Sequence, residues 1–307
     1  MGKNHNHNHS HSHQITKDIR LAFFLNLSFA ILEIFGGIYT NSLAIISDAV
    51  HDLGDSLSLG MAWYLEKHSH KQKDSSFSYG YRRLSSLAAL INTLILFIGS
   101  LYVITQAIPR VINPEPTDAK GMILFAILGV AVNGLAMLRL SKTSSLNGRV
   151  VAWHLFEDAL GWVAVLLVSI VLLFTDLYIL DPILSIAIAG YIIYNAIANL
   201  RQTLNLFLQA VPENIDLQQL EQSILALDRV NSLHHTHIWS LDGEHHVLTT
   251  HVVVEEDTTR EEILSIKSAV RHSGAKLNLE HITVEVEYHH EYCQMRQIEP
   301  AQHVHEH

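Results

Sequence analysis

The chain of 307 residues contains little cysteine and little charge. Its one cysteine, Cys293, excludes an intrachain disulfide framework and a zinc cluster built from several cysteines. Only 16% of the residues are charged, against roughly 25% in a typical soluble domain, whereas 49% are hydrophobic. The sequence also lacks an HExxH motif and a small-residue cleavage site after its first apolar segment. The composition therefore predicts a membrane protein. The missing motif argues against a zinc protease, and the missing cleavage site argues against a cleaved signal peptide.

The charge is unevenly distributed along the chain. Residues 1–211 carry a net charge of +1, whereas residues 212–307 carry −11. An acidic C-terminal part argues against nucleic acid or anionic lipid as a partner and is compatible with cations. We expect an apolar membrane part followed by a soluble part that interacts with metal ions.

Six apolar stretches have about the 20 residues that a membrane-spanning helix needs. They cover residues 19–39, 42–65, 84–108, 119–140, 146–174 and 180–208. Lys and Arg are concentrated in the segments 66–83 and 139–149, whereas the segments 39–42 and 175–181 contain neither. The positive-inside rule then places both termini in the cytoplasm. We predict an α-helical membrane domain of six transmembrane helices over residues 17–210.

A soluble pattern follows Val211-Pro212. We predict helices at 213–227 and 258–273 and strands at 233–241, 246–255 and 280–288, with a turn at Asp242-Gly243. This αββαβ order fits a small cytoplasmic α+β domain of ferredoxin-like type over residues 211–289. We expect the His-rich segment 1–16 and the polar segment 290–307 to be disordered tails.

Two His–Asp pairs occur deep inside apolar segments. His51 and Asp55 lie four residues apart in the second segment, as do His154 and Asp158 in the fifth, so each pair projects from one face of a helix. Interhelical hydrogen bonds alone would leave both carboxylates uncompensated, because no Lys or Arg lies in the interior of either segment. A charge at that depth costs at least ~2.5–3.5 kcal/mol. Two imidazoles and two carboxylates suit a tetrahedral zinc ion, so we predict that this quartet binds a divalent metal.

Other polar side chains in the apolar segments have two open interpretations, because each could line a metal pathway or form a polar contact between helices. Asp48 shares the helix face of His51 and Asp55 and could support the ligands or stage the ion. Asp52 and Glu157 point away from the ligand faces. The remaining candidates are Asn26, Glu33, Asn92 and Asn133.

The soluble part has a second group of candidate metal ligands. They are His234, His235, His237, His251, Glu285 and Glu287, all on predicted strands. Strand alternation predicts that His235 and His237 share one face and that His234 lies on the other. The residues predict a regulatory metal site here and leave open which three or four of them bind.

Motifs in matching order and spacing, over about residues 17–290, resemble the cation diffusion facilitator family and most resemble its bacterial zinc-efflux branch. They are Ser42-Leu43-Ala44, Ser47-Asp48-Ala49-Val50-His51 with Asp55, Tyr79-Gly80-Tyr81, His154 with Asp158, Asp181-Pro182-Ile183-Leu184-Ser185, and His234-His235-Thr236-His237-Ile238-Trp239.

This resemblance implies a homodimer in the cell inner membrane that exports cytosolic Zn²⁺ in exchange for protons. It implies that His51 is the zinc-selective version of a position where other members carry Asp. It also implies that His234, His251 and Glu287 bind metal in a metallochaperone-like cytoplasmic domain. Some members pair a base at the position of Arg83 with an acid just before Pro212; residues 208–211 here contain no acid.

Two other functions compete with transport. An intramembrane zinc hydrolase would need an open metal position and a nearby general base, for which Glu157 and Asp52 are the candidates. A metal sensor would signal through the acidic domain without moving ions. We expect a proton-coupled zinc antiporter with a midplane site, and not an enzyme.

Overall fold

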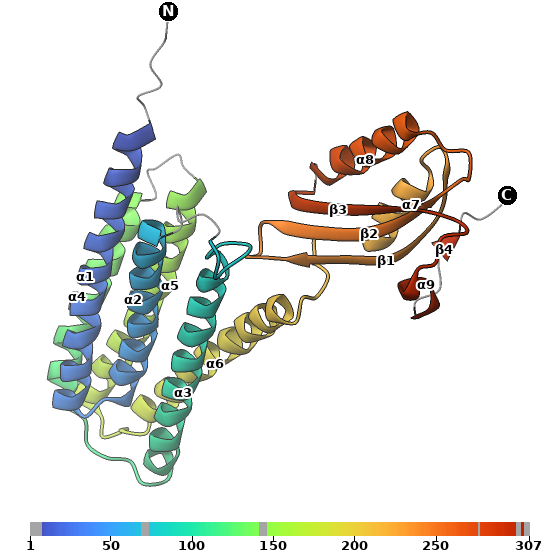
Figure 1. Cartoon of the computed structure of the whole chain (residues 1–307). Helices are drawn as coiled ribbons and strands as arrows, with labels where there is room; N and C mark the ends of the chain where they lie inside the picture. Colours follow the sequence, from blue (N-terminus) through green and yellow to red (C-terminus); the bar gives the residue numbers. More distant parts are fainter. Residues whose placement is uncertain (1–7, 69–73, 141–145, 276, 299–301, 304–307) are drawn as a thin grey trace, which may run out of the picture. The chain divides into compact units, whose positions relative to one another are not determined.

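The computed structural model describes residues 8–68, 74–140, 146–275, 277–298 and 302–303. The chain divides into two compact units, each with its own hydrophobic core (Figure 1). One comprises Met1–His70 and Leu87–Leu200 and is helical. The other comprises Lys71–Ser86 and Arg201–His307 and contains the β-sheet.

Six long helices occupy the six predicted apolar segments. They are α1 (Asn8–Thr40), α2 (Leu43–His68), α3 (Arg83–Ile112), α4 (Ala119–Leu140), α5 (Leu146–Phe174) and α6 (Leu180–Phe207). Helix α1 already begins within the segment 1–16, which we expected to be disordered, and residues 1–7 lie outside the described residues. The fold class of six helices followed by a small α+β domain is confirmed.

Five of these helices are long and apolar enough to cross a membrane by length and composition. The described residues of α2 do not meet that criterion, because Asp48, Asp52 and Asp55 interrupt its apolar sequence. Helix α2 nevertheless packs along α1 over much of its length. Helix α2, which does not meet the criterion for a membrane span, is therefore the helix that carries Asp48, Asp52 and Asp55.

Helices α1 and α2 pack as one pair and α4 and α5 as another, with further contacts between α1 and α4 and between α2 and α5. The shared core includes Ile45 of α2, Met122 of α4 and Trp162 of α5, all fully buried. Gly129 lets the two helices of the second pair approach closely. A Cβ atom at this position would lie 2.1 Å from the Trp162 indole.

A carboxylate from α6 caps the first turn of α2. The fully buried Asp181 accepts a hydrogen bond from the Ser42 hydroxyl at 2.5 Å and from the backbone N–H groups of Leu43 at 2.8 Å and Ala44 at 3.3 Å. The Ser185 hydroxyl, one turn later on α6, donates to the Leu43 carbonyl at 3.1 Å. Because the first N–H groups of a helix have no partner within it, Asp181 satisfies donors that would otherwise be buried unpaired.

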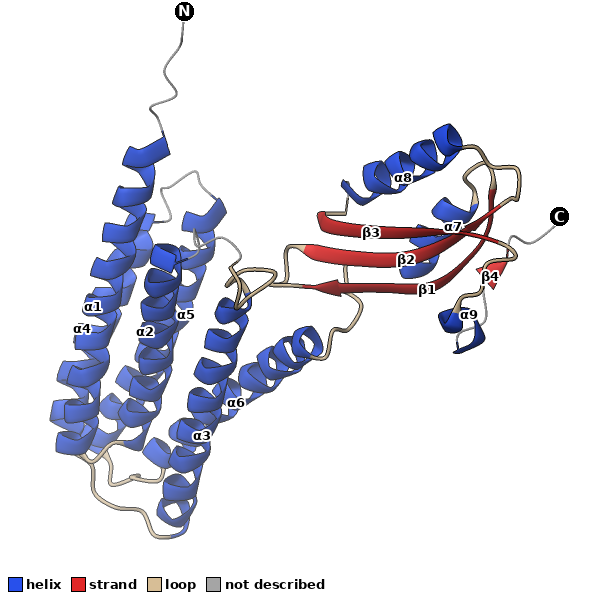
Figure 2. Cartoon of the chain, in the orientation of Figure 1, coloured by secondary structure: helices blue, strands red, loops and turns tan. Residues whose placement is uncertain are grey.

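The α+β domain contains a sheet in the order β3-β2-β1-β4 (Figure 2). Its main elements are α7 (Leu217–Leu225), β1 (Val230–Ser240), β2 (His246–Val254), α8 (Arg260–Ala275) and β3 (Leu279–Tyr288). Strands β1 and β2 are antiparallel, and β2 and β3 are parallel and joined through α8. This arrangement confirms the predicted αββαβ order.

The core of this domain lies between the two helices and one face of the sheet. Ile224 of α7, Val270 of α8 and Leu248 of β2 are among its most buried members. A capping box starts α8, where Thr259 and Glu262 each accept a hydrogen bond from the other's backbone N–H. The opposite face of the sheet is left for polar side chains.

The chain beyond Tyr288 forms α9 (Gln294–Ile298) and the short strand β4 (Gln302–His303), which pairs with β1. We expected disorder over residues 290–307 from the polar composition. The physical reason for the difference is that polar side chains of this segment contact the polar face of the sheet, and hydropathy does not register such contacts. Residues 299–301 and 304–307 lie outside the described residues.

A charge pair connects the segment before α3 to β3. Arg82 forms a bidentate ion pair with Glu280, and the Tyr79 ring lies 5.1 Å from that of His281. The resemblance had associated such a pair with the position of Arg83 and with residues just before Pro212, where this chain lacks the acid. Here a neighbouring arginine and a different acid form the contact.

We expect Asp181→Ala to destabilise the protein by about 2–4 kcal/mol, because three donors lose a buried acceptor. The measurement is thermal unfolding of the full chain in detergent. The control is Asp176→Ala, which removes an exposed carboxylate five residues earlier and should leave the transition unchanged. An Asp181→Ala variant as stable as the control would show that the cap does not hold α2 in place.

Candidate metal centres

The membrane quartet is assembled across α2 and α5. Asp55 and His154 are in contact, with 2.8 Å between Oδ2 and Nε2. His51 Nε2 lies 3.5 Å from Asp158 Oδ1, and His154 Nε2 lies 3.7 Å from Asp158 Oδ2. The two imidazole rings are 5.7 Å apart. All four side chains therefore meet at one point between the two helices.

Among the described residues, no Lys or Arg is paired with the two aspartates of the quartet. Asp55 and Asp158 form ion pairs with histidines. Asp158 is buried, and its Oδ1 atom has no hydrogen-bond donor among the described residues. One nitrogen of His51, one of His154 and one oxygen of Asp158 lie within 4.8 Å of one another, a spacing that suits ligation of a single ion.

The neighbouring acids differ in burial. Asp48 and Asp52 are each 5% exposed, and Asp48 reaches α5, where a Cβ on Gly161 would touch its carboxylate. Glu157 is exposed, in agreement with the prediction that it points away from the ligand face. Asp48 therefore lies beside the quartet, whereas Glu157 does not.

The four remaining polar candidates fall into two groups. Asn26 donates to the Ser56 hydroxyl of α2 at 3.2 Å, and Asn92 of α3 donates to the Ser58 hydroxyl of α2 at 2.7 Å. Both are hydrogen bonds between helices. Glu33 is fully buried and lies against Asp52 of α2, and the Asn133 amide nitrogen has no hydrogen-bond partner among the described residues.

In the α+β domain, a β-bulge gathers the histidines of β1. The register with β2 shifts between His234 and His237, and His235 adopts a positive φ of 52°. His234 and His235 consequently both approach His251 of β2, with ring centroids 5.0 and 5.2 Å away. Strict alternation had predicted opposite faces for His234 and His235, and the bulge accounts for the difference.

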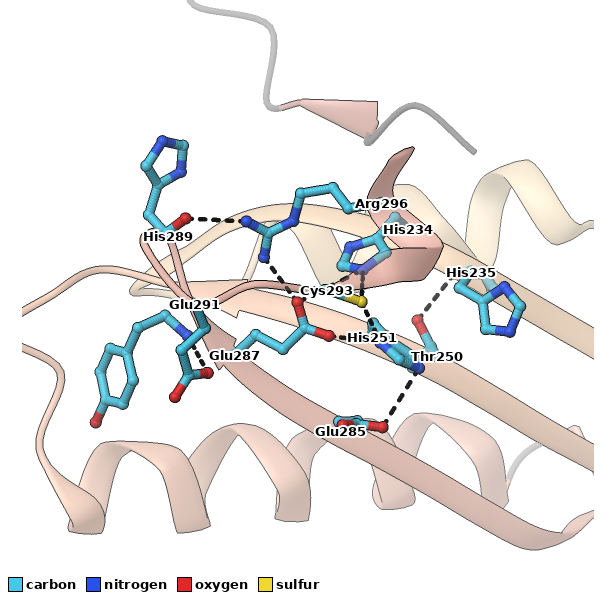
Figure 3. Close-up of polar contacts among 12 residues, drawn as sticks. His234, His235, Thr250, His251, Glu285, Glu287, His289, Glu291, Cys293 and Arg296 are labelled. Atoms are coloured by element: carbon cyan, nitrogen blue, oxygen red, sulfur yellow. Dashed lines mark hydrogen bonds and ion pairs between the residues drawn. The ribbon is translucent and has the colours of Figure 1, made fainter. Parts of the chain in front are cut away.

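A tight cluster forms around Glu287 of β3, on the sheet face opposite α7 and α8 (Figure 3). His251 Nδ1 lies 2.6 Å from Glu287 Oε1, and His234 Nε2 lies 3.5 Å from Glu287 Oε2. The other nitrogen of His251 faces Glu285 at 3.4 Å. The structure brings together the three residues that the resemblance implied and adds a carboxylate at the edge.

Burial and hydrogen bonding prepare these groups for a cation. Burial lowers the pKa of His234, which favours the neutral imidazole that metals require. Burial acts to raise the pKa of Glu287, but the hydrogen bond from His251, helped by Cys293 and His234, holds that pKa below its ordinary value. The cluster thus combines a neutral imidazole with an ionised carboxylate.

Sequence reasoning missed one member of this cluster. Cys293 Sγ lies 3.4 Å from His234 Nε2 and 3.7 Å from His251 Nδ1. One potential ligand atom from each of four residues lies within 4.8 Å of the other three; the residues are His234, His251, Glu287 and Cys293. The signal in the sequence was the short spacing of six residues between Glu287 and Cys293, which lets the chain return to the end of β3.

Comparison with known proteins covers both units. Residues 19–208 match the model of the cation efflux transmembrane domain, and residues 212–289 match that of the cation efflux protein cytoplasmic domain. The chain is 31% identical to a cadmium, cobalt and zinc/H(+)-K(+) antiporter of Bacillus subtilis, over 94% of this chain and 92% of the relative. It is 32% identical to the metal cation efflux system protein CzcD of Cupriavidus metallidurans, over 88% and 86%. It is 29% identical to the zinc transporter ZitB of Escherichia coli, over 87% and 86%. With both of its units matched, the chain belongs to the cation efflux family, the cation diffusion facilitators.

Proposed function

We propose that this protein is an antiporter that exports Zn²⁺ from the cytoplasm in exchange for protons, through the site formed by His51, Asp55, His154 and Asp158. The observation that carries the proposal is the meeting of two histidines and two aspartates from α2 and α5 with no Lys or Arg beside them among the described residues. The relatives that are named as zinc transporters and as a zinc antiporter support zinc as the cargo.

Metal and protons compete for the same four groups. Zinc binds neutral imidazole and ionised carboxylate, so protons must leave before the metal enters and can return after it departs. Because an imidazole nitrogen binds either a proton or a metal ion but not both, His51 and His154 can exchange one for the other. Rocking of the helices around a midplane site would expose the quartet to each side of the membrane in turn.

The energetics require this coupling. Moving Zn²⁺ outward against an inside-negative potential costs about 4.6 kcal/mol per 100 mV, because each elementary charge costs about 2.3 kcal/mol. Each returning proton contributes about 2.3 kcal/mol per 100 mV, and about 1.4 kcal/mol more per unit of pH gradient. Proton return can therefore drive export.

The proposed organisation has a membrane domain over 17–210 and a cytoplasmic domain over 211–289, in a homodimer of the cell inner membrane with both termini in the cytoplasm. The excess of Lys and Arg in the segments 66–83 and 139–149 supports the orientation. The matching model of the cytoplasmic domain carries the name ZT_dimer, which supports the dimer. In this proposal zinc at His234, His251 and Glu287 regulates transport.

The competing functions have less support. A hydrolase needs a general base beside the metal, but Glu157 is exposed on another face of α5. Asp52 lies against Glu33 of α1. A sensor without transport would not need histidines and carboxylates inside the apolar helices. Zinc flux into vesicles separates transport from both alternatives.

We expect Asp55→Asn and Asp158→Asn each to lower zinc uptake into inside-out vesicles by at least ~100-fold, because loss of even a supporting residue in a metal site costs 10–100-fold. Glu157→Gln, adjacent to Asp158 and exposed, is the matched control and should change uptake by no more than about twofold. Wild-type flux in either aspartate variant would remove the quartet from the transport path.

Zinc affinity should fall as the pH is lowered from about 7.5 to about 5.5, because protonated imidazoles cannot bind the metal. Uptake into inside-out vesicles should rise with an acidic lumen and collapse when a proton ionophore is added. His154→Ala should flatten the pH dependence of zinc affinity, measured by calorimetry across this range. Affinity that does not change with pH in the wild type, together with uptake insensitive to the ionophore, would exclude zinc–proton exchange.

His51→Asp should broaden selectivity, because it exchanges a borderline nitrogen ligand for a hard oxygen. We expect the variant to retain part of its zinc transport and to carry cadmium or manganese better than the wild type does. Uptake of each metal in competition with zinc provides the measurement. An unchanged preference for zinc would contradict the assignment of His51 as the selectivity residue.

A further inference from the structure

The segment after β3 folds back over the cluster around Glu287 and contributes two side chains to it. Cys293 faces His234 and His251, with its sulfur 3.4 and 3.7 Å from their nitrogens. Arg296 donates to Glu287 Oε2 at 2.7 Å (Figure 3). Cys293 and Arg296 are three residues apart, so one short segment supplies both side chains.

Arg296 occupies the position of a counter-cation. Its guanidinium binds one oxygen of Glu287, and His251 holds the other oxygen at 2.6 Å. The other terminal nitrogen of Arg296 donates to the His289 carbonyl at 2.9 Å, which ties the segment to its own beginning. A buried carboxylate is costly without such a partner. The ion pair thus stabilises Glu287 when no metal is present.

We propose that residues 289–298 form a metal-operated clasp. In this clasp Cys293 supplies a thiolate as the fourth ligand beside His234, His251 and Glu287. Arg296 holds Glu287 in the metal-free protein and is displaced when the metal binds. The proposal rests on the cytoplasmic metal site of the proposed function and deepens it by naming the ligand set and the part that moves.

Metal binding at the clasp would release one proton and displace one guanidinium. The Cys293 thiol loses its proton to solvent as its sulfur binds the metal, and Glu287 exchanges a guanidinium for a dication. Two nitrogens, one oxygen and one sulfur make a closed four-ligand site, as in structural and regulatory zinc sites. A thiolate ligand favours zinc, cadmium and cobalt over magnesium, calcium and manganese. The positive charge of the bound ion then repels Arg296.

The single cysteine of the chain makes Cys293 directly observable. Cobalt added to the detergent-solubilised full chain should produce a thiolate-to-cobalt charge-transfer absorption, with one sulfur ligand per chain. Because the membrane quartet contains no sulfur, this band reports the clasp alone. Cys293→Ala should abolish the band, and Asp158→Asn should leave it intact. Zinc should also protect the wild-type thiol from alkylation by iodoacetamide, a readout that needs no variant.

The role of Arg296 requires a separate measurement. Removing a competing cation should tighten metal binding, so Arg296→Gln should raise the apparent cobalt affinity about fivefold. Arg296→Lys should have a smaller effect. Arg229 is the matched control, because it pairs with Glu255 and Asp257 away from the cluster, and Arg229→Gln should leave the affinity unchanged. Hydrogen exchange of residues 289–298 should change when zinc is added.

Two results would overturn the clasp. Cobalt binding without a thiolate band, weakened by His234→Ala, would exclude Cys293 and leave a cytoplasmic metal site without it. Weaker binding in Arg296→Gln would mean that the arginine supports the site and does not compete with the metal. Failure of the transport proposal is distinguishable from both, because it would appear as absent zinc flux while the cobalt band persists.

Discussion

Carboxylates that lie between apolar helices without a Lys or Arg beside them among the described residues are the physical constraint on which the helical unit depends. Asp55 and Asp158 lie between α2 and α5, and the described residues offer them only histidines as partners. Such an arrangement costs several kcal/mol unless a cation is shared or protons are retained. In the proposed function the same groups would bind both zinc and protons, so the competition between them would be a property of the site itself.

The two candidate metal centres have similar ligands but take them from different kinds of structural element. The membrane quartet draws its four residues from two helices, so a change in helix packing alters the spacing of the ligands. The cluster of the α+β domain draws on three strands joined by backbone hydrogen bonds, and only Cys293 comes from a short following segment. A site shared between helices suits an ion that must leave, whereas a site fixed on a sheet suits an ion that is sensed.

Most of the fold follows from local sequence patterns. Apolar length predicted the six long helices, and the i, i+4 spacing predicted that α2 contributes to the candidate site even though its acids lower its hydropathy. The bulge at His235 was not predictable, because alternation assumes a regular strand. Cys293 was not predicted as a candidate ligand. A single cysteine excludes a site built from several cysteines, but it does not exclude one that combines cysteine with His and Glu. Arg296 and Glu287 lie nine residues apart, and polarity alone does not reveal that they pair.

The cap that Asp181 places on α2 makes that end of the helix a pivot. The start of α2 is tied to α6 by four hydrogen bonds, three to Asp181 and one from Ser185, whereas Asp55 lies twelve residues beyond Leu43, about 18 Å away at 1.5 Å per residue. When a rigid helix tilts about one fixed end, each residue moves in proportion to its distance from that end. A tilt of roughly 10° about the cap would move Asp55 by about 3 Å over that length, which is comparable to the 2.8 Å that separates it from His154. Under the proposed mechanism, a small rotation about the anchored end of α2 would therefore be enough to change the spacing of the quartet.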